Sequence, residues 1–248
     1  MDNEGTIEGR NAVIEALRSG INIDKVFIAK GEIDSTLKHI AGTARSSGAV
    51  VVEADKRKLD SMSQTGSHQG VIAVAAFAEY VTIDDILNTA RKKNEKPLIV
   101  ICDEISDPHN LGAIIRTCEA TGAHGIIIPK RRSAGINATV TKASSGAVFH
   151  MAIARVTNIT SAIKELKKAG VWIFAAVMDG DTELWESDFT EATALVIGSE
   201  GTGISRLVLE NCDHKVKIPM SGKLSSLNAS VSAAVLLFEA VRQRKQGS

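Results

Sequence analysis

The sequence lacks a net charge and any long apolar run. Its 29 basic and 29 acidic side chains cancel over 248 residues, so contact with nucleic acid must use a local patch rather than an overall positive field. The longest apolar run, residues 71–78, is far shorter than a bilayer-crossing helix. Residues 1–10 are polar and acidic, unlike a targeting segment. We therefore expect a cytoplasmic protein without membrane contact.

Cysteine is also scarce. Cys102, Cys118 and Cys212 are scattered without metal-ligand spacing, and each lies beside apolar residues, as buried thiols do. This usage indicates a reducing compartment. His109 and His150 have no partner at ligand spacing, so we expect no metal site.

Hydrophobic residues make up 44% of the chain, enough for a sizeable core. Alternating helix and strand patterns predict an α/β fold in three stretches: a small unit at 1–78, a linker at 79–96 that holds a weak helix at 83–90, and a larger unit at 97–248. Helices are expected at 9–18, 35–45, 56–62, 111–121, 137–144 and 159–168. Strands are expected at 25–29, 49–53, 70–77, 98–102, 125–128, 151–156, 171–177, 194–197 and 216–218.

A glycine cluster follows the strand expected at 194–197. Gly198, Gly201 and Gly203 expose backbone N–H groups where α/β sheets bind ligands. The spacing is neither that of a dinucleotide fingerprint nor that of a Walker loop, so the cluster fits a tight turn or a binding loop. Glu200 favours the binding loop, because a carboxylate between glycines can contact a ligand or fix a neighbouring loop.

Residues 103–116 carry many polar groups directly after a buried-type strand. Asp107 with Pro108 fits a helix N-cap and first turn, and Arg116 fits a solvated helix position. Asn110 and Arg116 lie six positions apart, about 240° around a helix, so they do not share a face. If both act on one substrate, it reaches over the helix end or a second subunit contributes.

Residues 218–234 are a polar loop that runs into a helix. Ser225 or Ser226 is the expected N-cap. The junction presents free backbone N–H groups, which suits a polar ligand. Apolar side chains recur at helical spacing, and we expect three of them in the core: Val231, Val235 and Phe238.

Three segments together resemble motifs one, two and three of the SpoU family, which comprises RNA ribose 2′-O-methyltransferases of the SPOUT superfamily. They are Asp103, Asp107, Pro108, Asn110, Gly112 and Arg116; Gly-Ser-Glu-Gly at 198–201; and Ile218, Pro219 and Met220 with Ser226, Leu227 and Asn228. The motifs occur in order at appropriate spacing. The first unit resembles that family's substrate-binding domain through Gly9, Arg10 and Asn11 and through His68, Gln69 and Gly70, although the second triplet also fits a simple turn.

The resemblance implies a catalytic domain with a parallel sheet and a trefoil knot. A small, ribosomal-protein-like α/β domain that binds RNA would precede it. It further implies a homodimer with active sites near the subunit interface, and S-adenosylmethionine as cofactor, with no metal. The cofactor-binding residues by resemblance are Gly198, Ser199, Gly201, Ile218, Pro219, Met220 and Leu227.

The catalytic residues implied by the family are Arg116 with Asn110, Glu200, Ser226 and Asn228. A guanidinium stays protonated in proteins, so we favour Arg116 as a stabiliser of the developing alkoxide and an anchor for a phosphate. The family's proposed role of Arg116 as a base is the competing account. Ser226 and Asn228 can orient either Glu200 or the ribose.

The combination of domains is most similar to bacterial enzymes that methylate a guanosine ribose of 23S ribosomal RNA. The alternatives are transfer RNA, an rRNA adenosine as in antibiotic resistance, and a non-catalytic RNA-binding assembly factor; no DNA substrate is expected. RNA contacts are expected from the first domain, from Lys130, Arg131 and Arg132, and from the run at 56–58. Each basic run also fits a solvated face.

Overall fold

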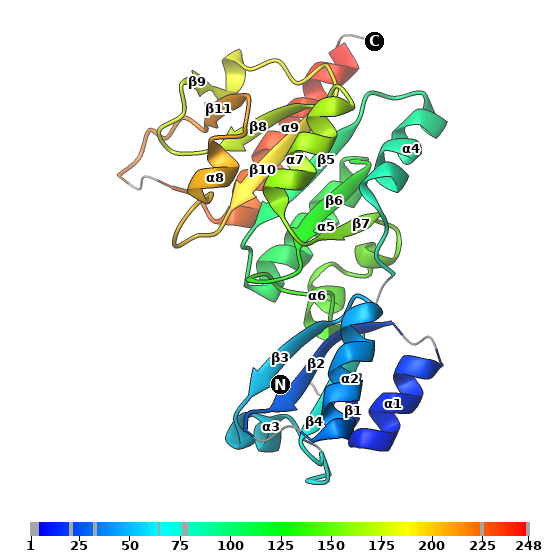
Figure 1. Ribbon diagram of the computed structural model, residues 1–248. Coiled ribbons are helices and arrows are strands. Elements are labelled where there is room, and N and C mark those ends of the chain that lie inside the picture. Colours follow the sequence, from blue (N-terminus) through cyan, green and yellow to red (C-terminus); the bar gives the residue numbers. More distant parts are fainter. Residues whose placement is uncertain are drawn as a thin grey trace. The chain divides into compact units, whose positions relative to one another are not determined.

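The computed structural model describes residues 5–19, 22–31, 34–63, 65–75, 79–223 and 226–246. Two compact units emerge from its contacts, one comprising residues up to 79 with 135–139, and the other comprising 80–134 with 140–248 (Figure 1). The predicted α/β class is confirmed in both units.

The first unit has a four-stranded mixed sheet in the order β1-β4-β2-β3, in which β2 and β3 are parallel and the other neighbours antiparallel. Its strands are β1 (Thr6–Glu8), β2 (Ile23–Ala29), β3 (Val50–Ala54) and β4 (Val71–Ala75). Its helices are α1 (Arg10–Arg18), α2 (Ser35–Ser46) and α3 (Lys56–Met62). Helices α1 and α2 pack on one face of the sheet, and Leu59 of α3 packs against Ile72 on the other.

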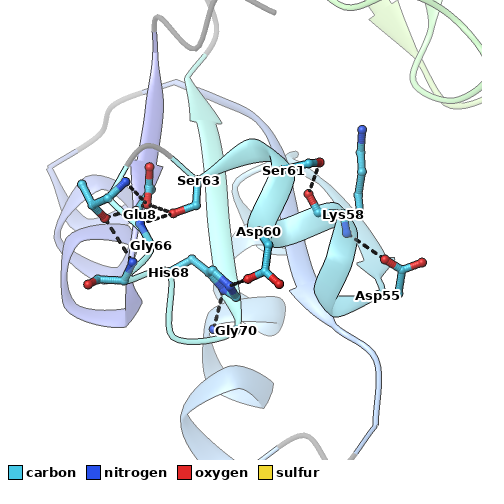
Figure 2. Close-up of polar contacts among 11 residues, drawn as sticks. Glu8, Asp55, Lys58, Asp60, Ser61, Ser63, Gly66, His68 and Gly70 are labelled. Carbon is cyan, nitrogen blue, oxygen red and sulfur yellow. Dashed lines mark hydrogen bonds and ion pairs between the residues drawn. The ribbon is translucent and has the colours of Figure 1, made fainter.

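A polar network closes the loop before β4. The buried His68 ring lies between Asp60, whose carboxylate is 3.0 Å from Nε2, and the backbone N–H of Gly70, which donates to Nδ1 at 3.0 Å (Figure 2). Next to it, the Arg10 guanidinium donates to the Gln69 carbonyl at 3.1 Å. The two halves of the domain's motif, residues 9–11 and 68–70, are therefore held side by side although they are far apart in sequence. This arrangement agrees with the structural interpretation of His68, Gln69 and Gly70.

The second unit is built on a seven-stranded, all-parallel sheet in the order β7-β6-β5-β10-β8-β11-β9. The strands are β5 (Leu98–Asp103), β6 (Gly125–Pro129), β7 (Ile153–Val156), β8 (Trp172–Ala176), β9 (Thr182–Glu183), β10 (Thr193–Gly198) and β11 (His214–Lys217). Helices cover both faces, which explains why the central strands are apolar on both sides.

Helices α4 (Ile83–Lys93), α7 (Ile159–Lys168) and α8 (Arg206–Leu209) cover one face of this sheet. Helices α5 (Pro108–Ala120) and α9 (Ala229–Gln246) pack together on the other, and Figure 1 shows α7 and α9 on opposite sides of β10. The short helix α6 (Ala138–Ala143) precedes a 3₁₀ turn, Ala147–Phe149, and another such turn spans Leu184–Glu186. No helix within the described ranges is long and apolar enough to cross a membrane.

Residues 79–96, which we expected to link the units, carry helix α4. Its Ile83, Ile86 and Leu87 belong to the core of the second unit. Gly125 at the start of β6 makes this packing possible, since a Cβ there would lie 2.6 Å from Ile86 Cγ1.

Helix α9 corrects two predictions. Its N-cap is Asn228, whose Oδ1 accepts from the backbone N–H groups of Ser230 at 2.9 Å and Val231 at 3.3 Å; Ser226 precedes that cap, and Ser225 lies outside the described residues. Val231 and Phe238 are 45% and 57% exposed and Val235 is half-buried, so they do not form the core face. The buried apolar side chains are Ala229, Ala233, Leu236, Leu237 and Ala240. The helix is apolar on two sides, and periodicity alone selected the wrong one.

Candidate functional site

The site lies where the two central strands end. Strand β10 runs parallel to β5, with Gly198 opposite Asp103. After β5 the chain continues to β6 on one side, and after β10 it continues to β11, which lies beyond β8 on the other side. Such a switch in strand order opens a crevice at the carboxyl ends of a parallel sheet. Asp103 is buried, and its carboxylate accepts from the backbone N–H of Ser205 at 2.7 Å. The loop after β10 is thereby fixed to the end of β5.

The glycine cluster is both a tight turn and a pocket wall. Ser199 and Gly203 exchange backbone hydrogen bonds of 3.1 and 2.9 Å, and the hydroxyls of Ser199 and Thr202 lie 2.8 Å apart. A Cβ on Gly198 would lie 2.3 Å from the Gly203 carbonyl carbon, and Gly203 itself has φ +68°. The tight-turn interpretation is therefore confirmed, whereas the binding-loop interpretation stays a prediction that the position of the loop beside a pocket favours.

Three of the predicted catalytic residues meet in one polar cluster. Asn110 Nδ2 donates to Glu200 Oε1 at 3.1 Å, and Asn228 Nδ2 donates to Asn110 Oδ1 at 2.9 Å and also to Glu200 Oε1. Asn110 is buried, whereas Glu200 and Asn228 are exposed. Two amides thus orient one carboxylate at the surface of the crevice.

Local sequence places Asn110 in this cluster. Asp107 caps α5 by accepting from His109 N–H at 2.9 Å, with Pro108 as the first helical residue, so Asn110 falls in the first turn at the crevice. Gly112 lets the helix pack tightly, because a Cβ there would lie 2.5 Å from Ala143 Cβ. The predicted cap is confirmed.

Arg116 stands apart from the other predicted catalytic residues. It is exposed on α5, it makes no hydrogen bond or ion pair with any residue that the structure describes, and it lines neither pocket beside the cluster. This placement agrees with the predicted difference in helix face between Asn110 and Arg116.

The larger of two pockets has a volume of about 640 Å³ and is bounded by the ends of β8, β10 and β11 and by the start of α9. Six of the seven predicted cofactor residues line it, namely Gly198, Ser199, Gly201, Ile218, Met220 and Leu227; Pro219 does not. Glu200, Ser226 and Asn228 also line it. Sequence reasoning missed Met178 and Asp179 after β8, although their position at a parallel strand's carboxyl end was a usable signal.

A second pocket, of about 470 Å³, adjoins the first. It is lined by residues 104–107, Asn110, Arg132 and residues 199–202, so the loop 199–202 forms a wall of both pockets. The cluster of Asn110, Glu200 and Asn228 therefore lies at the junction of two cavities.

Within the described residues, no group of three or more His, Cys, Asp or Glu side chains could hold a metal ion. Cys102 and Cys118 are buried, and burial raises the pKa of the Cys102 thiol to about 12. These two thiols are core residues without nucleophilic character.

Comparison with known proteins agrees with this geometry. Residues 97–238 match the model of the SpoU rRNA Methylase family, and residues 6–81 match that of RNA 2′-O ribose methyltransferase substrate binding. The putative TrmH family tRNA/rRNA methyltransferase YacO of Bacillus subtilis (strain 168) is 45% identical over 236 residues, which cover 95% of this chain and 94% of that protein.

Two solved structures of relatives contain the cofactor AdoMet. The SpoU methyltransferase AviRb of Streptomyces viridochromogenes aligns with a TM-score of 0.63 and 27% identity over 98% of this chain and 91% of that one. An AdoMet-bound rRNA methyltransferase of Sinorhizobium meliloti aligns with a TM-score of 0.60 and 26% identity over 96% and 86%. Since the model of the SpoU rRNA Methylase family matches more than half of this chain, the chain belongs to that family.

Proposed function

We propose that this chain transfers a methyl group from S-adenosylmethionine to the 2′-hydroxyl of a guanosine ribose in 23S ribosomal RNA, in the cytoplasm. Family membership makes it an S-adenosylmethionine-dependent RNA ribose 2′-O-methyltransferase, so the proposal concerns the RNA and the nucleotide. One observation carries the assignment of chemistry to residues: the cluster of Asn110, Glu200 and Asn228 lies between two adjoining pockets.

The larger pocket fits S-adenosylmethionine. Its volume of about 640 Å³ is within the range of small-molecule sites. The loop 198–203 lines it and would hold the polar parts of the molecule through backbone groups, and Leu209, Val216 and Leu227 would offer apolar contact. When bound, the cofactor supplies a methyl group made electrophilic by its sulfonium sulfur.

The chain's own residues then position the acceptor. In the transfer, the ribose 2′-oxygen would form a bond to the methyl carbon while the methyl–sulfur bond breaks. The electron pair of that bond would stay on sulfur, which becomes a neutral thioether, and the hydroxyl proton would pass to water. We assign Glu200, held by the amides of Asn110 and Asn228, to orient the ribose by accepting from a hydroxyl. Ser226 lines the same pocket and is assigned to the cofactor side of the reacting atoms.

Arg116 requires a second subunit in this scheme. The outer side of α9 exposes Val231 and Phe238, and α9 packs beside α5, which carries Arg116. We propose that two chains pair through these helices and that Arg116 of one chain reaches the pocket of the other. There its guanidinium stabilises the developing alkoxide. The trefoil knot implied by the family likewise stays a prediction about how the segments around 198–228 thread.

Transfer RNA is the second candidate substrate, because YacO is named a tRNA/rRNA methyltransferase. An rRNA adenosine is a third. A non-catalytic assembly factor is disfavoured by the intact cluster, because capping of α9 by Asn228 does not require its amide to meet Asn110 and Glu200 between two pockets.

The decisive experiment is methyl transfer with labelled S-adenosylmethionine to unmodified 23S RNA and unmodified transfer RNA, followed by mapping of the labelled ribose. We expect one guanosine of 23S RNA to be labelled, and we expect Glu200→Gln to remove the label. Labelling confined to transfer RNA, or mapped to an adenosine, would contradict the proposed target.

A further inference from the structure

The second pocket contains an ion pair that has no role in the proposed methyl transfer. Glu104 Oε1 accepts from Arg132 Nη1 at 3.1 Å. Among the described residues that line this pocket, Arg132 is the sole cation, beside three carboxylates of Glu104, Asp107 and Glu200. Each of those carboxylates already accepts a hydrogen bond, Asp107 from its own helix cap and Glu200 from Asn110.

Both residues of this ion pair have an unusual backbone conformation. Glu104 and Arg132 both have left-handed backbones, with φ +58° and +57°, a conformation that is strained for non-glycine residues and recurs at functional sites. The segments that carry Glu104 and Arg132 are also joined by the residues that follow this ion pair. The Ala134 N–H and the Ser133 hydroxyl both donate to the Ile105 carbonyl, at 2.8 and 3.1 Å.

The pair contributes little to stability. The Arg132 side chain is 80% exposed, and solvent weakens ion pairs at such positions. A guanidinium has five N–H donors, and Arg132 makes no other hydrogen bond with a described residue. With Nη1 held by Glu104, the remaining edge is free to meet a ligand.

We propose that the second pocket holds the target nucleotide and that Arg132, aimed by Glu104, binds the phosphate next to the ribose being methylated. The inference rests on the proposed function, because the ribose is placed at the wall shared with the larger pocket, where Glu200 lies hydrogen-bonded to Asn110. The volume of about 470 Å³ is suitable for one nucleotide.

Phosphate is the favoured partner of Arg132 for two reasons. A guanidinium edge matches two phosphate oxygens. Lys130 and Arg131 precede Arg132 directly, so the positive charge continues along the chain beside the pocket. Glu104 acts through Arg132 and is a positioning residue.

The test compares Arg132→Gln with Arg91→Gln, which alters an exposed arginine on α4 that is also paired with a carboxylate, that of Asp84, and lines neither pocket. Methyl transfer is measured in single turnovers at saturating S-adenosylmethionine and saturating RNA, with RNA affinity measured against salt. Arg132→Gln should slow the saturated step roughly 10- to 100-fold through misplacement of the ribose. It should also lower the salt slope of RNA binding by about 1. Arg91→Gln should leave the saturated step within about twofold of wild type, since Arg91 has no place in the pocket.

Two further variants separate charge from geometry. Arg132→Lys should keep the salt slope but lose much of the rate, because an ammonium does not form the two-pronged contact. Glu104→Gln should slow the saturated step while leaving the salt slope unchanged. All four variants should keep the wild-type melting temperature and affinity for S-adenosylmethionine.

A wild-type rate for Arg132→Gln, or equal effects of Arg91→Gln and Arg132→Gln, would overturn the inference. So would a change in base preference without a change in salt slope, which would mean that Arg132 reads a base. A wild-type protein that methylates no RNA would overturn the proposed function itself and with it this inference.

Discussion

The side-chain amide of Asn228 donates to Oδ1 of Asn110 at 2.9 Å, across 118 positions of the chain. The other end of the same amide, Asn228 Oδ1, caps helix α9. One side chain therefore fixes both the start of a helix and the polar cluster between the two pockets.

Substitution of Asn228 should separate these two roles. Asn228→Asp keeps a capping oxygen but sets a second carboxylate against Glu200, so we expect a near-normal melting temperature and a loss of methyl transfer of roughly 100-fold. Asn228→Ala should lose the activity and also about 1 kcal/mol of unfolding free energy. Thermal melting and methyl-transfer rates measure both effects, and an active Asn228→Asp protein would contradict the assigned role.

Gly198→Ala should disrupt the wall of the cofactor pocket. The added Cβ meets backbone atoms of Gly203 and Ile204, which cannot move aside as a flexible side chain would. We expect a loss of about 1–3 kcal/mol in unfolding free energy and weaker binding of S-adenosylmethionine. Gly201→Ala is the matched control, since a Cβ there meets nothing within 4 Å. Equal melting temperatures for the two variants would refute this explanation.

Mixed dimers should test the origin of Arg116. If Arg116 serves the partner's pocket, mixing inactive Arg116→Ala chains with inactive Glu200→Gln chains should restore about a quarter of wild-type activity, because half the dimers are mixed and each has one intact site. An arginine that acts within its own chain predicts no recovery. Co-expression and methyl-transfer assays distinguish the two, with each variant alone as control.

His124 should make stability depend on pH. Burial lowers the pKa of this histidine, while the hydrogen bond with Glu95 opposes the shift. Nδ1 of His124 accepts from Leu98 N–H at 3.0 Å. Below about pH 6.5 the unfolded chain binds the proton more readily than the folded one. The unfolding free energy should therefore be highest above pH 6.5 and should fall as the pH drops through the lowered pKa.

Urea unfolding between pH 5 and 8 measures this dependence. His124→Asn should flatten it, whereas His39→Asn, which alters an exposed histidine, should not. A wild-type profile for His124→Asn would show that another group is responsible.

Much of the fold could be predicted because local signals agreed with it. Helices at 56–62 and 159–168 and the cap at Asp107 rest on periodicity and N-cap chemistry, and the structure has them at those residues. The two- and three-residue strands β9 and β1 were missed, because only pairing with distant strands holds such short segments extended. Helix α9 was turned the wrong way since both of its sides are apolar.

The candidate site could likewise be predicted only in part from the sequence. The residues of the polar cluster were named from motifs, but a sequence does not show that residues 104–107 and Arg132 share a cavity with Glu200. That proximity comes from strand order, which brings the ends of β5, β6 and β10 together. Pocket walls made of distant segments are therefore the part that sequence reasoning misses.

The double use of Asn228 also bears on local motion. If the first turn of α9 frays, the cap is broken, and the amide of Asn228 leaves Asn110 and Glu200 in the same movement. Opening of the helix end and dissolution of the polar cluster are then a single event. Any ligand that tightens the cluster also protects that turn from solvent.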